Sequence, residues 1–169
     1  MCIQILRAKF ENNSADFRKK WHSCRNGTFA NKKIVFNMET SLISPCGMNC
    51  GICLAYLRTK NVCPGCRIDD PKKSSSCSNC IIKNCELLEK TESGFCYDCE
   101  KFPCKRLKQL DKRYRTKYNM SMLENLENIK TLGLEHFIKA ETERWLCPQC
   151  GGTICVHRGC LSCKEKLKN

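Results

Sequence analysis

The cysteines are the residues of this sequence best suited to chemistry, because six pairs of them have the C-x2-C spacing. Two intervening residues allow a tight turn that aims both sulfurs at one point. Two such turns supply the tetrahedral set of four thiolates that Zn²⁺ prefers, at about 2.3 Å from each sulfur. One pair alone is weak evidence of a metal site, but six pairs among 169 residues are strong. We therefore predict several structural metal ions, most simply zinc.

The spacing between pairs groups them into sites. Cys50–Cys66 and Cys147–Cys163 both read C-x2-C-x9-C-x2-C, and Cys77–Cys99 has the C-x2-C-x15-C-x2-C spacing of two-knuckle zinc sites. Cys85 and Cys104 each follow a pair by the same x4 spacing and are expected to be ligands as well. The predicted ligands are Cys46, Cys50, Cys53, Cys63, Cys66, Cys77, Cys80, Cys85, Cys96, Cys99, Cys104, Cys147, Cys150, Cys160 and Cys163.

Two alternative groupings remain open. In the tail, Cys155 has the position of the third ligand of a zinc knuckle, although the ribbon pairing is favoured because it uses Cys163. Near the start of the cysteine-rich stretch, Cys46-x3-Cys50-x2-Cys53 has the spacing that holds a [4Fe–4S] cluster in radical S-adenosylmethionine enzymes. Too few residues follow for the barrel of such an enzyme, but a simple iron–sulfur cluster completed by a distant thiolate is possible.

Composition favours metals over disulfides. The chain has 18 cysteines and only 8% aromatic residues, so its core needs reinforcement. The N-terminus lacks the apolar region of a signal peptide, and no stretch has the 18 apolar residues of a membrane span. We expect a cytoplasmic protein without a membrane segment, whose thiols stay reduced and bind metal. Three four-thiolate sites would lower the formal charge of +13 to about +7.

The chain divides into four segments. Residues 1–41 are a basic, weakly structured arm, and 42–104 form a cysteine-rich metal-binding module with helical pieces of one to two turns at most. Residues 105–145 are a helical segment, and 146–169 are a tail that resembles a zinc ribbon or knuckle. The predicted fold class is a small, metal-stabilised mixture of helices and irregular structure. Because the cysteine-rich module has the least core, we expect chelation to unfold residues 46–104 first.

About three helices are expected in the helical segment. Leu107, Leu110, Tyr114 and Tyr118 fall on one helical face. Residues 121–124 form a capping box that opens a second helix, which Gly133 ends, and 134–145 form a third.

The other face of the first helix is basic and could follow the phosphate backbone of RNA. The alternative is a solvated face that balances the acidic, metal-loaded module. The candidate contacts are Lys105, Arg106, Lys108, Lys112, Arg113, Arg115 and Lys117.

The motifs at 45–53 (PCGMNCGIC), 63–66 (CPGC) and 102–104 (FPC) resemble a family of cysteine-rich domains of unknown function, common in archaea and anaerobic bacteria. The likeness covers about 42–110. Trp145 followed by CPQCGG and a closing C-x2-C looks like the zinc-ribbon end of many members. The resemblance implies a prokaryotic cytoplasm and metal binding, but no reaction or substrate.

The predicted function is therefore a multi-site zinc-binding protein with two to four Zn²⁺. No G-x-S-x-G, P-loop or G-x-G-x-x-G motif is present, so we expect a non-catalytic module that contacts protein or RNA. Two alternatives remain. One is an iron–sulfur redox or cluster-carrier protein of anaerobic metabolism, and the other is a thiol-dependent enzyme that uses an unligated cysteine such as Cys104 or Cys155. His157, inside the tail, is the one histidine considered as a ligand.

Overall fold

A computed structural model describes residues 39–71 and 73–164. All of these residues belong to one compact unit of the chain. Nearly all of the predicted basic arm, residues 1–38, lies outside the described residues, so its character stays a prediction.

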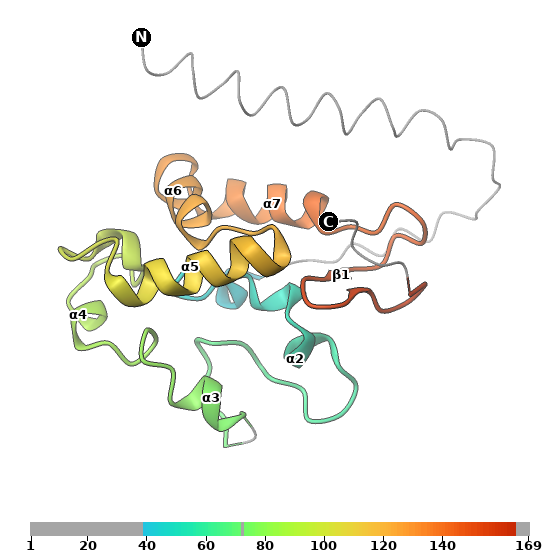
Figure 1. The fold of residues 1–169 in the computed structure, drawn as a ribbon, viewed down its shortest axis with the longest axis horizontal. Coiled ribbons are helices and arrows are strands. Elements are labelled where there is room, and N and C mark those ends of the chain that lie inside the picture. Colours follow the sequence, from blue (N-terminus) through green and yellow to red (C-terminus); the bar gives the residue numbers. More distant parts are fainter. Residues whose placement is uncertain (1–38, 72, 165–169) are drawn as a thin grey trace, which may run out of the picture. The chain divides into compact units, whose positions relative to one another are not determined.

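Three main helices follow one another in the second half of the chain (Figure 1). They are α5 (Lys105–Tyr118), α6 (Met122–Leu132) and α7 (Leu134–Arg144). The Ser121 hydroxyl accepts a hydrogen bond from the Glu124 amide, which confirms the predicted N-cap of α6. Gly133, with a φ of +86°, ends α6 and begins the turn into α7. Among the described residues, no helix has the length and hydrophobicity that a membrane span requires.

Among its described residues, the cysteine-rich segment contains only single helical turns, as its short apolar pieces predicted. These are η2 (Thr40–Leu42), η3 (Cys50–Ile52), α2 (Leu54–Leu57), α3 (Ser75–Ser78), α4 (Glu86–Glu89) and η4 (Cys96–Asp98). Turns of this length are not stable alone, because nucleation of a helix fixes several residues for one hydrogen bond. Their positions must therefore be set by tertiary contacts.

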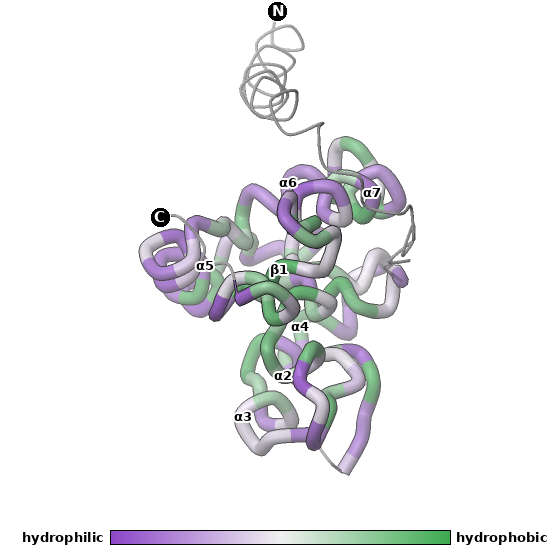
Figure 2. Tube along the Cα trace, turned by 90° about the vertical axis from the view of Figure 1, so that its right-hand side faces the viewer, coloured by the Kyte–Doolittle hydropathy of each residue, from purple (hydrophilic) through white to green (hydrophobic). Residues whose placement is uncertain are grey.

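One hydrophobic core is shared by segments that are far apart in sequence. Ile43 and Ile52 come from the cysteine-rich segment, Leu126 and Phe137 from α6 and α7, and Val156 from the tail, and all five are buried in one cluster. Figure 2 shows hydrophobic and hydrophilic stretches alternating along α5 to α7, as expected for helices with one buried face. The boundaries of the four predicted segments remain predictions. Residues from the cysteine-rich segment, the helical segment and the tail nevertheless share one core.

Buried polar contacts join the same segments. The Glu141 carboxylate in α7 accepts hydrogen bonds from Asn49 Nδ2 at 3.2 Å and from Trp145 Nε1 at 2.9 Å. Burial raises the pKa of Glu141, while nearby Arg144 and these two hydrogen bonds act to lower it. The Val156 amide donates to the Ile52 carbonyl at 2.9 Å. The cysteine-rich segment, α7 and the tail are thus held together by hydrogen bonds as well as by the core.

Gly47 of the cysteine-rich segment lies directly against α6. Its carbonyl accepts a hydrogen bond from Asn125 Nδ2 at 2.9 Å, and its φ is +81°. A Cβ atom at this position would lie 2.9 Å from both the Met122 carbonyl oxygen and Leu126 Cγ. The chain therefore needs glycine here both for its backbone conformation and for the space.

Candidate metal centre

A small hairpin in the tail brings two cysteine turns together. Strands β1 (Ile154–Cys155) and β2 (Gly159–Cys160) pair antiparallel, with Cys155 opposite Gly159. Before β1, the Cys147 amide donates to the Gly152 carbonyl at 2.7 Å, and the Gly151 amide donates to the Cys147 carbonyl at 2.9 Å. These bonds close the first turn beside the second, which follows β2.

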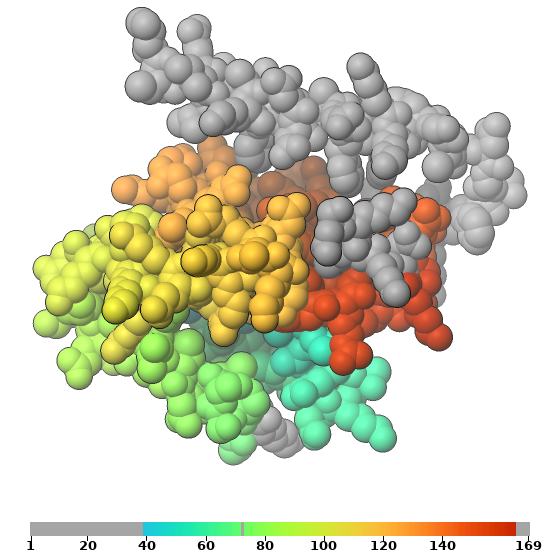
Figure 3. All heavy atoms as spheres, viewed as in Figure 1, coloured from blue at the N-terminus to red at the C-terminus, as the bar shows by residue number. Residues whose placement is uncertain are grey.

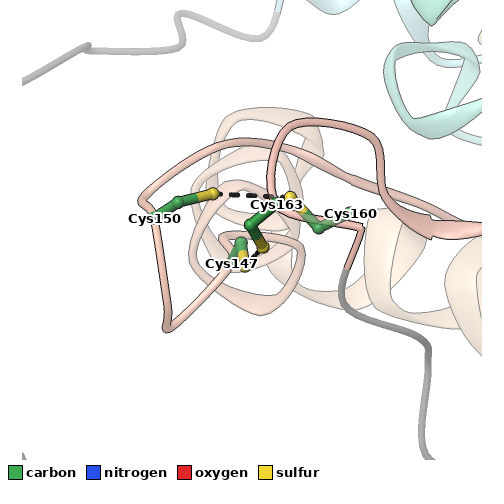
Figure 4. A group of neighbouring side chains, drawn as sticks. All are labelled: Cys147, Cys150, Cys160 and Cys163. Carbon is green, nitrogen blue, oxygen red and sulfur yellow. Dashed lines mark hydrogen bonds between the residues drawn. The ribbon is translucent and has the colours of Figure 1, made fainter.

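The four sulfurs of Cys147, Cys150, Cys160 and Cys163 all lie within 4.8 Å of one another (Figure 4). Cys147 Sγ is 3.6 Å from Cys163 Sγ, and Cys150 Sγ is 3.5 Å from Cys160 Sγ. Four sulfurs about 2.3 Å from a tetrahedral ion would be ~3.8 Å apart, so the spacing suits one metal ion. We call these four residues the tail tetrad. It includes Cys163 and not Cys155, as the ribbon pairing predicted.

Local hydrogen bonds favour the thiolate of Cys160. Burial acts to raise its pKa, but the amides of Cys163 and Ser162 and the thiol of Cys150 lower the pKa to about 7. Since the thiolate is the form that ligates metals, the tail tetrad contains one ligand that is partly ionised at neutral pH.

The first predicted site is only partly assembled. The Cys66 amide donates to Cys50 Sγ at 3.3 Å, so the two ends of the C-x2-C-x9-C-x2-C motif meet. Cys46 is buried nearby, and burial, with the charges of Cys66 and Cys80, raises its pKa to about 11. For Cys53, burial raises the pKa, and the charges of Cys77 and Cys155 add to the effect.

Two cysteines of the second predicted site line a cavity with two other cysteines. Cys96 and Cys99 line a cavity together with Cys85 and Cys104, whereas Cys77 and Cys80 are not among its lining residues. Burial first, and then the charges of neighbouring cysteines, raise the pKa of Cys96 to about 12. The shared C-x2-C-x4-C spacing, which made Cys85 and Cys104 candidate ligands, was the signal in the sequence for this group.

The two remaining candidates, His157 and Cys155, are packed against other residues of the chain. The Leu54 amide donates to His157 Nδ1 at 3.4 Å, and the His157 ring packs against Tyr118 with centroids 5.0 Å apart. Burial lowers the pKa of His157. Cys155 has no exposed surface, which does not suit a nucleophile that must reach a substrate. No disulfide joins any of the cysteines in the described part of the chain.

The seven predicted basic contacts on α5 are all exposed, and Figure 3 shows the atoms of α5 at the surface of this face. Arg115 pairs with the buried Asp111 at 2.9 Å. The other six form no ion pair with any residue that the structure describes. Arg106 donates to the Ile81 carbonyl at 3.3 Å, and the Arg113 guanidinium lies 5.8 Å from the centre of the Tyr114 ring.

Comparison with known families adds one finding. Residues 42–109 match a family model described as a protein of unknown function (DUF3795). Over these residues the chain is similar to DUF3795 proteins. This confirms the resemblance predicted for residues 42–110, and the match includes every predicted ligand from Cys46 to Cys104 but none of the tail tetrad. No curated protein and no solved structure matches the chain.

Proposed function

We propose that this protein is a non-catalytic, zinc-stabilised module that contacts RNA through α5. The observation that carries the zinc assignment is the tail tetrad, whose four sulfurs already lie at the spacing of one ion. Four thiolates fill all positions of a tetrahedral zinc ion, and a site with no open position is structural rather than catalytic. Zinc ligated by cysteines of the segment that matches DUF3795 would bring the total to between two and four ions.

Metal analysis of matched cysteine variants tests the tail tetrad. Cys163→Ser is expected to lose one zinc per chain, because it removes an exposed ligand of the tetrad. Cys155→Ala is the control, since Cys155 is the nearby cysteine outside the tetrad, and it should keep the full zinc content. Elemental analysis after exhaustive dialysis measures both. Zinc loss from Cys155→Ala with retention in Cys163→Ser would replace the ribbon set with the knuckle set.

The exposed cations of α5 support the RNA contact. Lys105, Lys108, Lys112 and Arg115 are spaced i, i+3, i+7 and i+10, which forms one stripe along the helix. If this face served to balance the acidic metal module, we would expect carboxylates of that module to pair with it. In the described residues only Arg115 of this face pairs with a carboxylate, and that carboxylate, Asp111, is in α5 itself. The three lysines of the stripe form no ion pair with described residues, and such cations in a row are suited to a phosphate backbone.

Charge reversal on α5 tests this contact. Lys108→Glu, Lys112→Glu and Lys117→Glu together are expected to weaken binding to a single-stranded RNA by more than tenfold at low salt. Loss of three phosphate contacts would also reduce the slope of log K against log salt by about 2. Fluorescence anisotropy at several salt concentrations measures both quantities.

The matched control makes the same charge change on exposed lysines of other elements, with Lys90→Glu, Lys130→Glu and Lys139→Glu. An equal loss in both triple variants would mean that net charge alone attracts RNA. If the unmodified protein bound no RNA but the α5 variant lost a protein partner, α5 would be a protein-binding surface.

A further inference from the structure

A cavity of about 40 Å³ lies where α4 and η4, both within the DUF3795 match, meet α5. Four of its lining residues are cysteines, and each stands at the end of an element. Cys85 precedes α4, Cys96 begins η4, Cys99 follows η4, and Cys104 is the N-cap of α5. We call these four residues the cavity cysteines.

The cavity has an apolar lining and is partly open to solvent. A volume of about 40 Å³ has room for roughly three water molecules. Water would need polar partners, but the walls are formed almost entirely by carbon and sulfur atoms, including side chains of Ile82, Leu88 and Phe102. The space therefore suits a guest that binds sulfur better than it suits water.

The spacing of the sulfurs separates this group from the tail tetrad. The tail tetrad has its sulfurs within 4.8 Å of one another, while the cavity cysteines, all within the described residues, do not form such a group. One zinc ion would hold its four sulfurs ~3.8 Å apart, in contact with all of them and with no space between. Four cysteines that border an open space suit a guest with several metal atoms.

We propose that Cys85, Cys96, Cys99 and Cys104 hold a [4Fe–4S] cluster. Four cysteine thiolates are the ligand set of such clusters. With a 2+ core, the ligated cluster carries a charge of −2, and the cations Lys101 and Arg106 line the same cavity. The apolar walls would shelter the cluster from solvent. This cluster would be separate from the tail zinc, and its ligands differ from Cys46, Cys50 and Cys53, whose spacing first suggested a cluster.

Reconstitution of the full chain tests the proposal. Anaerobic incubation with ferrous iron, sulfide and a thiol should give about four iron and four acid-labile sulfide per chain. It should also give a broad absorption near 400 nm. Dithionite adds one electron to the cluster core, without a change in covalent bonds, and should produce a paramagnetic signal in electron paramagnetic resonance. Cys99→Ser and Cys104→Ser should lose the iron and the absorption.

Cys163→Ser is the matched control, because it should lose one zinc and keep all of the iron. Iron and zinc thus report separately on the cavity cysteines and on the tail tetrad, so failure of one assignment is distinguishable from failure of the other. Retention of iron in Cys99→Ser and Cys104→Ser would place the cluster elsewhere. Zinc in place of iron, lost in those two variants alone, would make the cavity a second zinc site.

A second variant avoids any effect of ligand loss on folding. Lys101→Gln with Arg106→Gln removes two exposed positive charges from the rim while all four thiolates remain. Its cluster should have a more negative reduction potential, since positive charge near a cluster favours the reduced form. Lys112→Gln with Lys117→Gln is the control, because Lys117 lies about 16 Å farther along α5 than Arg106. Equal potentials in the two double variants would contradict the assignment.

Discussion

Cys150→Ser is expected to lower the midpoint of thermal unfolding, with the helices α5 to α7 and the tail hairpin still unfolding in a single transition. Zinc-finger peptides gain about 10–16 kcal/mol from one structural zinc site, whereas in this chain the shared core keeps the variant folded at low temperature. Trp145 and Val156, on either side of the first cysteine turn of the tail, are buried in that core. Loss of the proposed tail zinc would therefore weaken the whole core.

Two probes of the same thermal unfolding curve measure this. Circular dichroism at 222 nm follows the helices, and fluorescence follows Trp145 in a Trp21→Phe background that leaves one tryptophan. Ser162→Ala is the matched control, because Ser162 lies between two ligands and contributes its backbone amide rather than its side chain to Cys160. A changed Trp145 spectrum with an unchanged helical signal would show that the tail folds independently.

The same experiment tests the order of unfolding that the sequence predicted. The cysteine-rich stretch 46–104 has few apolar residues, which predicted that it would unfold first on chelation. The structure instead places Ile43 and Ile52 in one core with α6 and α7. We now expect helical and cysteine-rich parts to unfold together.

Gly47→Ala is expected to destabilise the protein by roughly 2–5 kcal/mol. A residue with a side chain at a left-handed φ costs about 1–2 kcal/mol, and overpacking costs about 1–3 kcal/mol more. The added methyl group would lie 2.9 Å from the carbonyl oxygen of Met122, which is helical backbone and cannot move without moving α6. The free energy of unfolding, measured by urea denaturation of the metal-loaded protein, gives the cost directly.

Gly94→Ala separates the cost of the left-handed backbone conformation from the cost of overpacking. Gly94 also has a positive φ, +65°, but its added Cβ would meet only the tip of the Arg67 side chain at 3.4 Å. Its expected cost is the conformational part alone, about 1–2 kcal/mol. Equal costs at the two positions would mean that α6 does not approach Gly47 as closely as the structure shows.

The segment of this chain that matches DUF3795 is therefore not self-contained. The family match ends inside α5, but Gly47 and Asn49, both within the match, make buried hydrogen bonds to α6 and α7, beyond it. A fragment cut at the end of the match would leave Asn49 without the Glu141 carboxylate and the Ile52 carbonyl without the Val156 amide. Experiments on this segment should accordingly retain residues up to the tail hairpin.

The sequence alone determined the features that depend on neighbouring residues. The helical period of Leu107, Leu110 and Tyr114, the N-cap at Ser121 and the stop at Gly133 are all local, and the structure has each of them. The tail tetrad was also predicted from its spacing, and a short hairpin joins its two C-x2-C turns. The same spacing at Cys50–Cys66, all within the described residues, forms no such group, so the spacing proposes a site and the local fold completes it.

Only the tertiary structure decided which distant residues meet. Spacing paired Cys96 and Cys99 with Cys77 and Cys80, but a cavity surrounds them with Cys85 and Cys104, because α4 and the start of α5 pack beside η4. The contacts of Asn49 with Glu141 and of Gly47 with Asn125 join residues 92 and 78 positions apart. Such pairs leave no periodic pattern in a sequence, since they depend on how every element between them folds and packs.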